Sequence, residues 1–175
     1  MEIMIIYQQA FDLYHTIYRI INILGNFKYA DSIELDRLRI WDYYLLFPNK
    51  LKSISLKREE KDIKNLINNY ISKEQNPYEI ILNDRKMLEK ILPFQMGALK
   101  YLASIGLIDK DYLKNNRISK ISDEVLLELR QITAELTPQE KNTISLLTGH
   151  FFYVPLIGKD GLKSRSNLLD SRYDA

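Results

Sequence analysis

The segment from Arg37 to Pro48, RLRIWDYYLLFP, constrains the fold more than any other part of the sequence. It holds the only tryptophan of the chain, and four of seven consecutive residues in it are aromatic. Leu38, Trp41 and Leu45 recur at the spacing of one helical face, so they predict a helix that buries this face. Pro48 disfavours helical geometry at the residue before it, which predicts where the helix ends. The three spaced residues are most simply explained as core residues.

Composition limits the class of protein. Hydrophobic residues make up 46% of the 175 residues, which is enough for a packed core and excludes a disordered chain. Because cysteine is absent, disulfides, thiolate metal sites and a cysteine nucleophile are excluded, and a reducing cytoplasm is the expected compartment. The formal net charge of +2 is too small to indicate nucleic-acid binding by itself. No apolar run is long enough to span a bilayer, so we expect a cytoplasmic protein without a membrane partner.

Capping signals predict further helices. Apolar residues crowd more than one face of Phe11 to Leu24, and Gly25 follows where a helix C-cap favours positive φ. Asp31 and Glu34 have the spacing of a capping box and predict the start of the helix that contains the tryptophan. The segment Thr137 to Glu140 has the same spacing, with proline at the first helical position.

The middle of the chain has the element order of a winged helix-turn-helix. A helix is predicted to end near Ile91, with a break at Pro93, and a second helix is predicted to end at Gly106. Asn115 and Asn116 suit a two-residue hairpin turn, because asparagine tolerates left-handed geometry. The sequence therefore predicts a mainly α (α+β) protein, with a winged helix-turn-helix core and a short β-hairpin wing.

This order divides the chain into three predicted parts within one compact unit. Residues 1–55 form an N-terminal helical pair, and residues 56–122 form the winged-helix-like region. Residues 123–175 contain C-terminal helices followed by a polar, loop-like tail.

Catalytic signatures are missing from the sequence. The two histidines, His15 and His150, lie far apart and lack the spacing of metal ligands. No phosphate-binding glycine loop and no hydrolase nucleophile motif occurs. We therefore expect no enzyme activity, no catalytic residue, no cofactor and no metal.

Two sets of residues are candidates for binding. The first comprises Arg37, Tyr43 and Phe47, which belong to the tryptophan segment but fall outside its buried face. A lone soluble helix has mainly polar residues there, whereas aromatic residues and arginine are enriched in protein interfaces. These three residues are therefore the predicted partner-binding residues.

The second set is basic. Lys100, Lys114, Arg117 and Lys120 lie on or near the predicted wing, where they could contact DNA phosphates. The alternative is an ordinary solvated surface, because acidic residues are interspersed among them. The competing function is a free-standing winged-helix DNA-binding transcription regulator, which binds a palindrome as a homodimer.

The first 50 residues resemble the middle component of bacterial ABC-three-component conflict systems, most closely the Lamassu-type small accessory subunit. The residues that carry this resemblance are Phe11, Asp12, His15, Arg19, Asp36, Arg37, Leu38, Asp42, Tyr43, Leu46, Phe47 and Pro48. The resemblance implies a non-catalytic subunit that works with an SMC/Rad50-like ABC ATPase in antiphage defence. It also implies an effector nuclease that this subunit helps to hold inactive, and a contact with double-stranded DNA through the complex.

Overall fold

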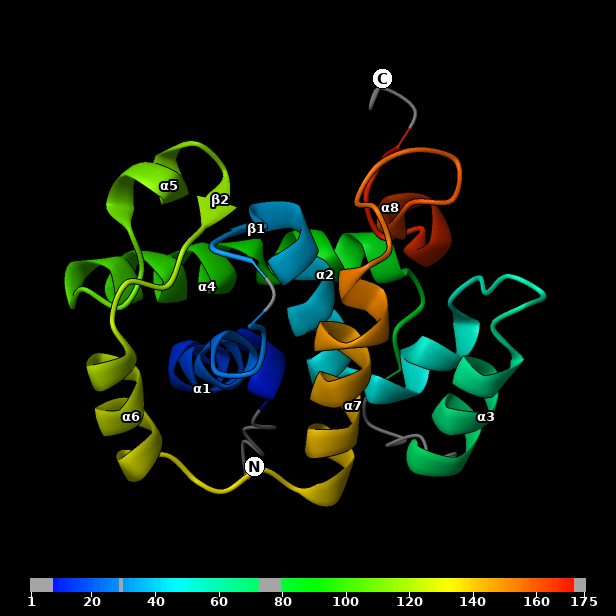
Figure 1. Ribbon diagram of the computed structural model, residues 1–175, viewed down its shortest axis with the longest axis horizontal. Coiled ribbons are helices and arrows are strands. Elements are labelled where there is room, and N and C mark those ends of the chain that lie inside the picture. The colour runs from blue at the N-terminus through cyan, green and yellow to red at the C-terminus, as the bar shows by residue number, and fades with distance from the viewer. Residues whose placement is uncertain (1–7, 29, 73–79, 172–175) are drawn as a thin grey trace, which may run out of the picture.

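The computed structural model describes residues 8–28, 30–72 and 80–171 (Figure 1). In these residues the chain is mainly helical with one two-stranded antiparallel sheet, which confirms the predicted mainly α class. The elements in order are η1 (Gln9–Phe11), α1 (Leu13–Leu24), β1 (Ile33–Glu34), α2 (Leu35–Leu46), η2 (Pro48–Ser53), α3 (Lys61–Tyr70), α4 (Asp84–Ser104), α5 (Lys110–Lys114), β2 (Arg117–Ile118), α6 (Asp123–Ile132), α7 (Pro138–Thr148), η3 (His150–Phe152) and α8 (Leu162–Ser166).

Helices α1, α2 and α4 pack against one another at the centre of the molecule. Figure 1 shows α1 nearly end-on between α6 and α7, with α4 running across the view above it. Leu38, Trp41 and Leu45 of α2 are 1%, 0% and 4% exposed, so the predicted core face of this helix is confirmed. Helix α2 ends at Leu46, one residue before Phe47, because Pro48 follows.

The start of α2 differs from the prediction. Ile33 and Glu34 form strand β1, so the predicted capping box at Asp31 is wrong. Glu34 is the N-cap residue, but its side chain does not cap the helix. It accepts a hydrogen bond of 2.7 Å from Nε of Arg37 instead. The second predicted capping box, between Thr137 and Glu140, is confirmed.

Helix α4 is continuous through Pro93, so the predicted break and turn are wrong. A proline inside a helix removes one hydrogen bond and costs about 3 kcal/mol. Burial of Leu88, Ile91, Leu99 and Leu102 on one face of α4 offsets this cost. A helix-turn-helix centred on Pro93 is therefore not formed.

The small sheet joins segments that are far apart in the sequence. Strand β1 pairs with β2 so that Ile33 lies opposite Ile118. Residues 107–109 run antiparallel to residues 119–121, with hydrogen bonds of 3.0 and 2.9 Å at the two ends. These contacts fix the segment after α4 against the residues that follow β2.

Helix α5 lies directly before Asn115 and Asn116, where the hairpin turn was predicted. Oδ1 of Asp109 accepts hydrogen bonds from the backbone N–H groups of Asp111 and Tyr112, which starts this short helix. Asn115 is its C-cap, and Asn116 has a φ of 57°. The left-handed geometry predicted for asparagine is present, but a two-residue hairpin turn is not, and the predicted winged-helix core is not confirmed.

The C-terminal segment is packed more tightly than predicted. It contains η3 and α8, and Leu162 and Arg165 of α8 are buried. Nζ of Lys163 lies 3.0 Å from the carboxylate of Asp36, which ties α8 to α2. The division at residues 55 and 122 stays a prediction. Within the described part of the chain, no helix has both the length and the apolar content needed to cross a bilayer.

Candidate functional site

A buried ion pair joins the two N-terminal segments that carry the family resemblance. Nε and Nη2 of Arg19 in α1 donate hydrogen bonds of 2.6 and 3.2 Å to the two carboxylate oxygens of Asp42 in α2. Both side chains are 1% exposed. Gln95 of α4 completes the set by donating to Asp42 at 2.8 Å. The three central helices therefore share one polar network.

His15 and Thr16 extend this network along α1. Nη1 of Arg19 lies 2.7 Å from Nδ1 of His15, and Nη2 donates to Oγ1 of Thr16 at 3.2 Å. Burial and the neighbouring Arg19 lower the pKa of His15, so the neutral imidazole can accept the hydrogen bond. The network satisfies its own charges inside the core, and its role is to fix the packing of the helices.

Arg37 is also a core residue. It is 5% exposed, and its Nη1 donates to the carbonyl oxygens of Phe151 and Val154 at 3.0 and 2.9 Å. The guanidinium thus holds the turn after α7 against α2. Its assignment as a partner-binding residue depended on an exposed side chain, and that premise is wrong.

The same correction applies to the two aromatic residues. Tyr43 is 0% exposed and Phe47 is 5% exposed, and their ring centroids lie 5.1 Å apart. The hydroxyl of Tyr43 donates to Oδ1 of Asp84 at 2.8 Å, and burial raises the pKa of the phenol. The prediction placed both rings on the outer face of α2, but α1, α4, α7 and η2 pack around this helix and the two rings are buried.

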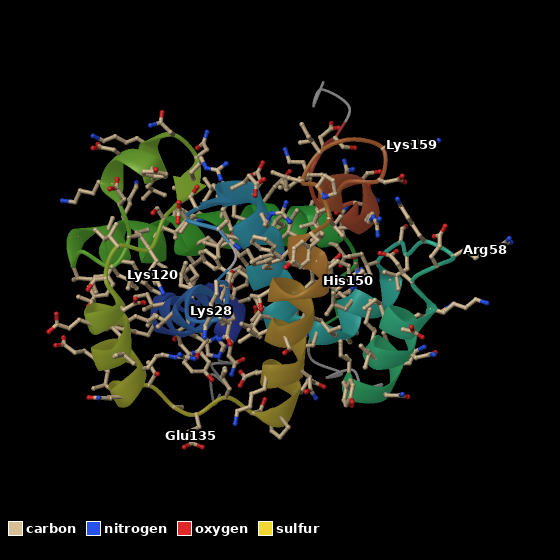
Figure 2. The ribbon with its side chains drawn as sticks, in the orientation of Figure 1. Lys28, Arg58, Lys120, Glu135, His150 and Lys159 are labelled. Carbon is tan, nitrogen blue, oxygen red and sulfur yellow. The ribbon has the colours of Figure 1, made fainter. Side chains whose placement is uncertain are left out.

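Two of the four predicted DNA-binding residues, Arg117 and Lys120, have close partners within the chain. Arg117 donates to Oγ and to the carbonyl oxygen of Ser32 at 2.9 and 3.2 Å. Nζ of Lys120 lies 2.6 Å from the carboxylate of Asp123, at the start of α6 (Figure 2). These two cations are therefore engaged by neighbouring groups of the same chain.

Lys100 and Lys114 lie together at a hollow between α4 and α5. Met96, Ala103 and Leu113 provide its apolar lining, and the pocket volume is about 360 Å³. Lys110 is the third lysine that borders it. We call this feature the lysine-rimmed hollow, defined by Met96, Lys100, Ala103, Lys110, Leu113 and Lys114.

The charge of this hollow is positive and largely uncompensated. In the described chain, no carboxylate lies within ion-pair distance of Lys100 or Lys110. Lys114 has one contact of 3.7 Å to Asp111, between side chains that are 78% and 87% exposed. Such an exposed pair within one helix contributes at most about 0.5 kcal/mol and can exchange for a partner carboxylate.

Lys110, Met96 and Leu113 are not among the residues that the sequence predicts for a binding site. The available signal was the spacing of Lys110 and Lys114, which puts both on one side of a helix. The hairpin prediction hid that signal, because residues four apart are about 13 Å apart along a strand and only about 6 Å apart along a helix. For metal binding, residues 8–28, 30–72 and 80–171 contain no cluster of three or more ligating side chains.

Comparison with known proteins gives a family. A family model described as the ABC-three component (ABC-3C) system Middle Component 5 matches residues 5–174. No curated protein and no solved structure matches the chain. The match covers nearly the whole chain, and it includes the buried network and the hollow alike. This chain belongs to the Middle Component 5 family of ABC-three-component systems.

Proposed function

We propose that this chain is a non-catalytic accessory subunit that binds the ABC ATPase of its system through the lysine-rimmed hollow. Membership of the family implies association with an ABC ATPase component. The observation that carries the proposal is the hollow itself, an apolar depression bordered by Lys100, Lys110 and Lys114. The occupant we assign is a segment of the ATPase with a large apolar side chain flanked by aspartate or glutamate.

The apolar lining favours a protein over DNA at this site. Phosphate contacts need cations, but they do not need a hollow lined by Met96, Ala103 and Leu113. A pocket that receives an apolar anchor residue is the usual centre of a protein interface. The lysines around it supply the charge complementarity that orients an acidic partner and speeds its association.

The position of the hollow fits a winged-helix fold that is built from other elements than those predicted from the sequence. We infer that α1, β1, α2, α4, residues 107–109 and β2 form this fold, in that order. Helix α3 is then an insertion between the second and third helices, and α5 is an insertion in the wing. In this arrangement α4 takes the place of the recognition helix, and the hollow lies between that helix and the wing.

The resemblance in the first 50 residues extends the proposal to the rest of the complex. It suggests a Lamassu-type system in which the ATPase is SMC/Rad50-like and the effector is a nuclease. The accessory subunit then helps to restrain the effector, and contact with double-stranded DNA occurs through the assembled complex.

Co-purification tests the proposal. The ABC ATPase encoded beside this chain is co-expressed with the wild type or with a variant carrying Lys100→Glu, Lys110→Glu and Lys114→Glu. We expect the variant to weaken binding by more than about tenfold, because three attractive contacts become repulsive.

A matched variant controls for total charge. Lys86→Glu, Lys90→Glu and Lys141→Glu change the net charge equally at exposed positions outside the hollow. Equal loss of binding in both variants would show that the hollow is not the docking site. Absence of ATPase binding by the wild type contradicts the accessory role. A variant that binds the ATPase normally but loses binding to a DNA duplex assigns the hollow to DNA.

A further inference from the structure

A second pocket lies between η2 and α3, away from the lysine-rimmed hollow. Its volume is about 470 Å³, within the range of sites that bind small organic molecules. Leu51, Ile54 and Ile67 in its lining are buried core residues. The complete lining is Leu51, Lys52, Ile54, Leu56, Lys57, Arg58, Glu60, Lys61, Lys64, Ile67 and Asn68.

The cations of this pocket outnumber its carboxylates by five to one. Two of them are engaged, since Lys52 donates to the carbonyl oxygen of Ser72 at 3.2 Å and Lys57 pairs with Asp160 at 3.2 Å.

The other three cations are Arg58, Lys61 and Lys64. Arg58 points away from the body of the protein in Figure 2. Among the described residues, none places a carboxylate within ion-pair distance of Lys61 or Lys64. These two exposed lysines, one turn apart on α3, are therefore available to an anion.

Glu60 is the carboxylate in the described lining of the pocket, and its charge is already paired, so it does not repel an incoming anion. Both oxygens of Glu60 accept hydrogen bonds of 2.9 Å from Nη1 of Arg165, and Oε1 lies 2.8 Å from Nε2 of His150. Burial would raise the pKa of Glu60, but hydrogen bonds from the Lys57 amide, Arg165 and His150 lower it below the ordinary value. The carboxylate of Glu60 thus keeps its negative charge, and hydrogen bonds from Arg165 and His150 compensate that charge.

We propose that this pocket binds a small organic phosphate of the nucleotide class. Lysine ammonium groups bind phosphate oxygens through charge-assisted hydrogen bonds. Half-buried Leu56 and the aliphatic stems of the lysines provide an apolar surface for the ring of a base, which inorganic phosphate does not need. The pocket shares no lining residue with the lysine-rimmed hollow. Ligand binding in the pocket therefore does not depend on how the ATPase binds.

Isothermal titration of the full chain tests this site with ATP and, separately, with inorganic pyrophosphate. We expect saturable binding of ATP, and weaker binding of pyrophosphate because it lacks the ring. Lys61→Glu with Lys64→Glu is expected to weaken ATP binding by at least about tenfold. Both residues are exposed, so the variant is expected to fold, and a circular dichroism melt checks this.

Lys86→Glu with Lys90→Glu is the matched control, since these lysines are one turn apart on the exposed side of α4. This control is expected to change ATP binding by less than about twofold. The proposal is overturned if the wild type shows no saturable ATP binding, if the two variants weaken it equally, or if pyrophosphate binds as tightly as ATP. Loss of DNA-duplex binding in the pocket variant, with no effect of ATP, would assign the cations to nucleic acid instead.

Discussion

The buried network of α1, α2 and α4 and the lysine-rimmed hollow use cations in opposite ways. Arg19 is 1% exposed and has its carboxylate partner at 2.6 Å within the chain. Lys100 and Lys110 border an open hollow and have no such partner in the described residues. A cation whose charge is matched internally contributes to one fixed fold, whereas an unmatched exposed cation remains available to another molecule. The difference separates the residues that specify the fold from those proposed to bind.

Removing one member of the buried pair is expected to have the largest effect on folding. Asp42→Ala leaves the guanidinium of Arg19 buried without its carboxylate, which costs about 3–5 kcal/mol. Urea denaturation followed by circular dichroism measures the loss.

The double variant Arg19→Met with Asp42→Leu sharpens this prediction. It replaces both charges by apolar side chains, and we expect it to recover most of the stability lost in Asp42→Ala. A double variant as unstable as the single one would mean that volume or packing, and not the unmatched charge, causes the loss.

Phe47→Ala tests the corrected place of the aromatic residues in the core. Phe47 is 5% exposed and its ring packs on Tyr43, so truncation is expected to cost about 3 kcal/mol. If Phe47 were a surface residue, the denaturation midpoint would hardly move. Tyr43→Phe is the milder companion, because it removes only the hydrogen bond to Asp84, worth about 1 kcal/mol.

The core was easier to predict from the sequence than the surface. Leu38, Trp41 and Leu45 follow the helical period, and their burial follows from that period alone. The burial of Tyr43 and Phe47 could not be derived in this way, because it depends on elements distant in sequence that cover the other faces of α2. The spacing of apolar residues in a helix identifies one buried face, but it does not show whether other elements also cover the remaining faces of that helix.

Local signals also failed where tertiary packing outweighed them. Pro93 is a strong helix breaker, but the buried face of α4 keeps that helix continuous. Asn115 and Asn116 suit a hairpin turn, but the side chain of Asp109 caps a short helix in front of them. The hollow could not be predicted, since it exists only because this helix packs against α4.

The free energy of unfolding is expected to depend on pH through Glu60, by less than the losses expected for the core substitutions. The pKa of Glu60 in the folded state lies below the ordinary value of 4.5. The stabilisation is therefore present above the unfolded pKa and is lost as the pH falls through the folded pKa. Glu60→Gln should be less stable than the wild type at about pH 7, and the gap should narrow below about pH 4. Denaturation midpoints at both pH values measure this gap, and a constant difference would refute the assignment.

The smallest effect on folding is expected in the hollow. Lys100→Ala, Lys110→Ala and Lys114→Ala together should change the free energy of unfolding by no more than about 0.5 kcal/mol, because only one exposed ion pair is lost. The same variant should still lose affinity for the ATPase, since its three favourable charges are gone. Denaturation and co-purification of this one variant therefore separate the two regions. If the variant unfolds, the lysines contribute to the fold. If it is stable and binds normally, the apolar lining alone carries the contact, and Leu113→Ser becomes the decisive substitution.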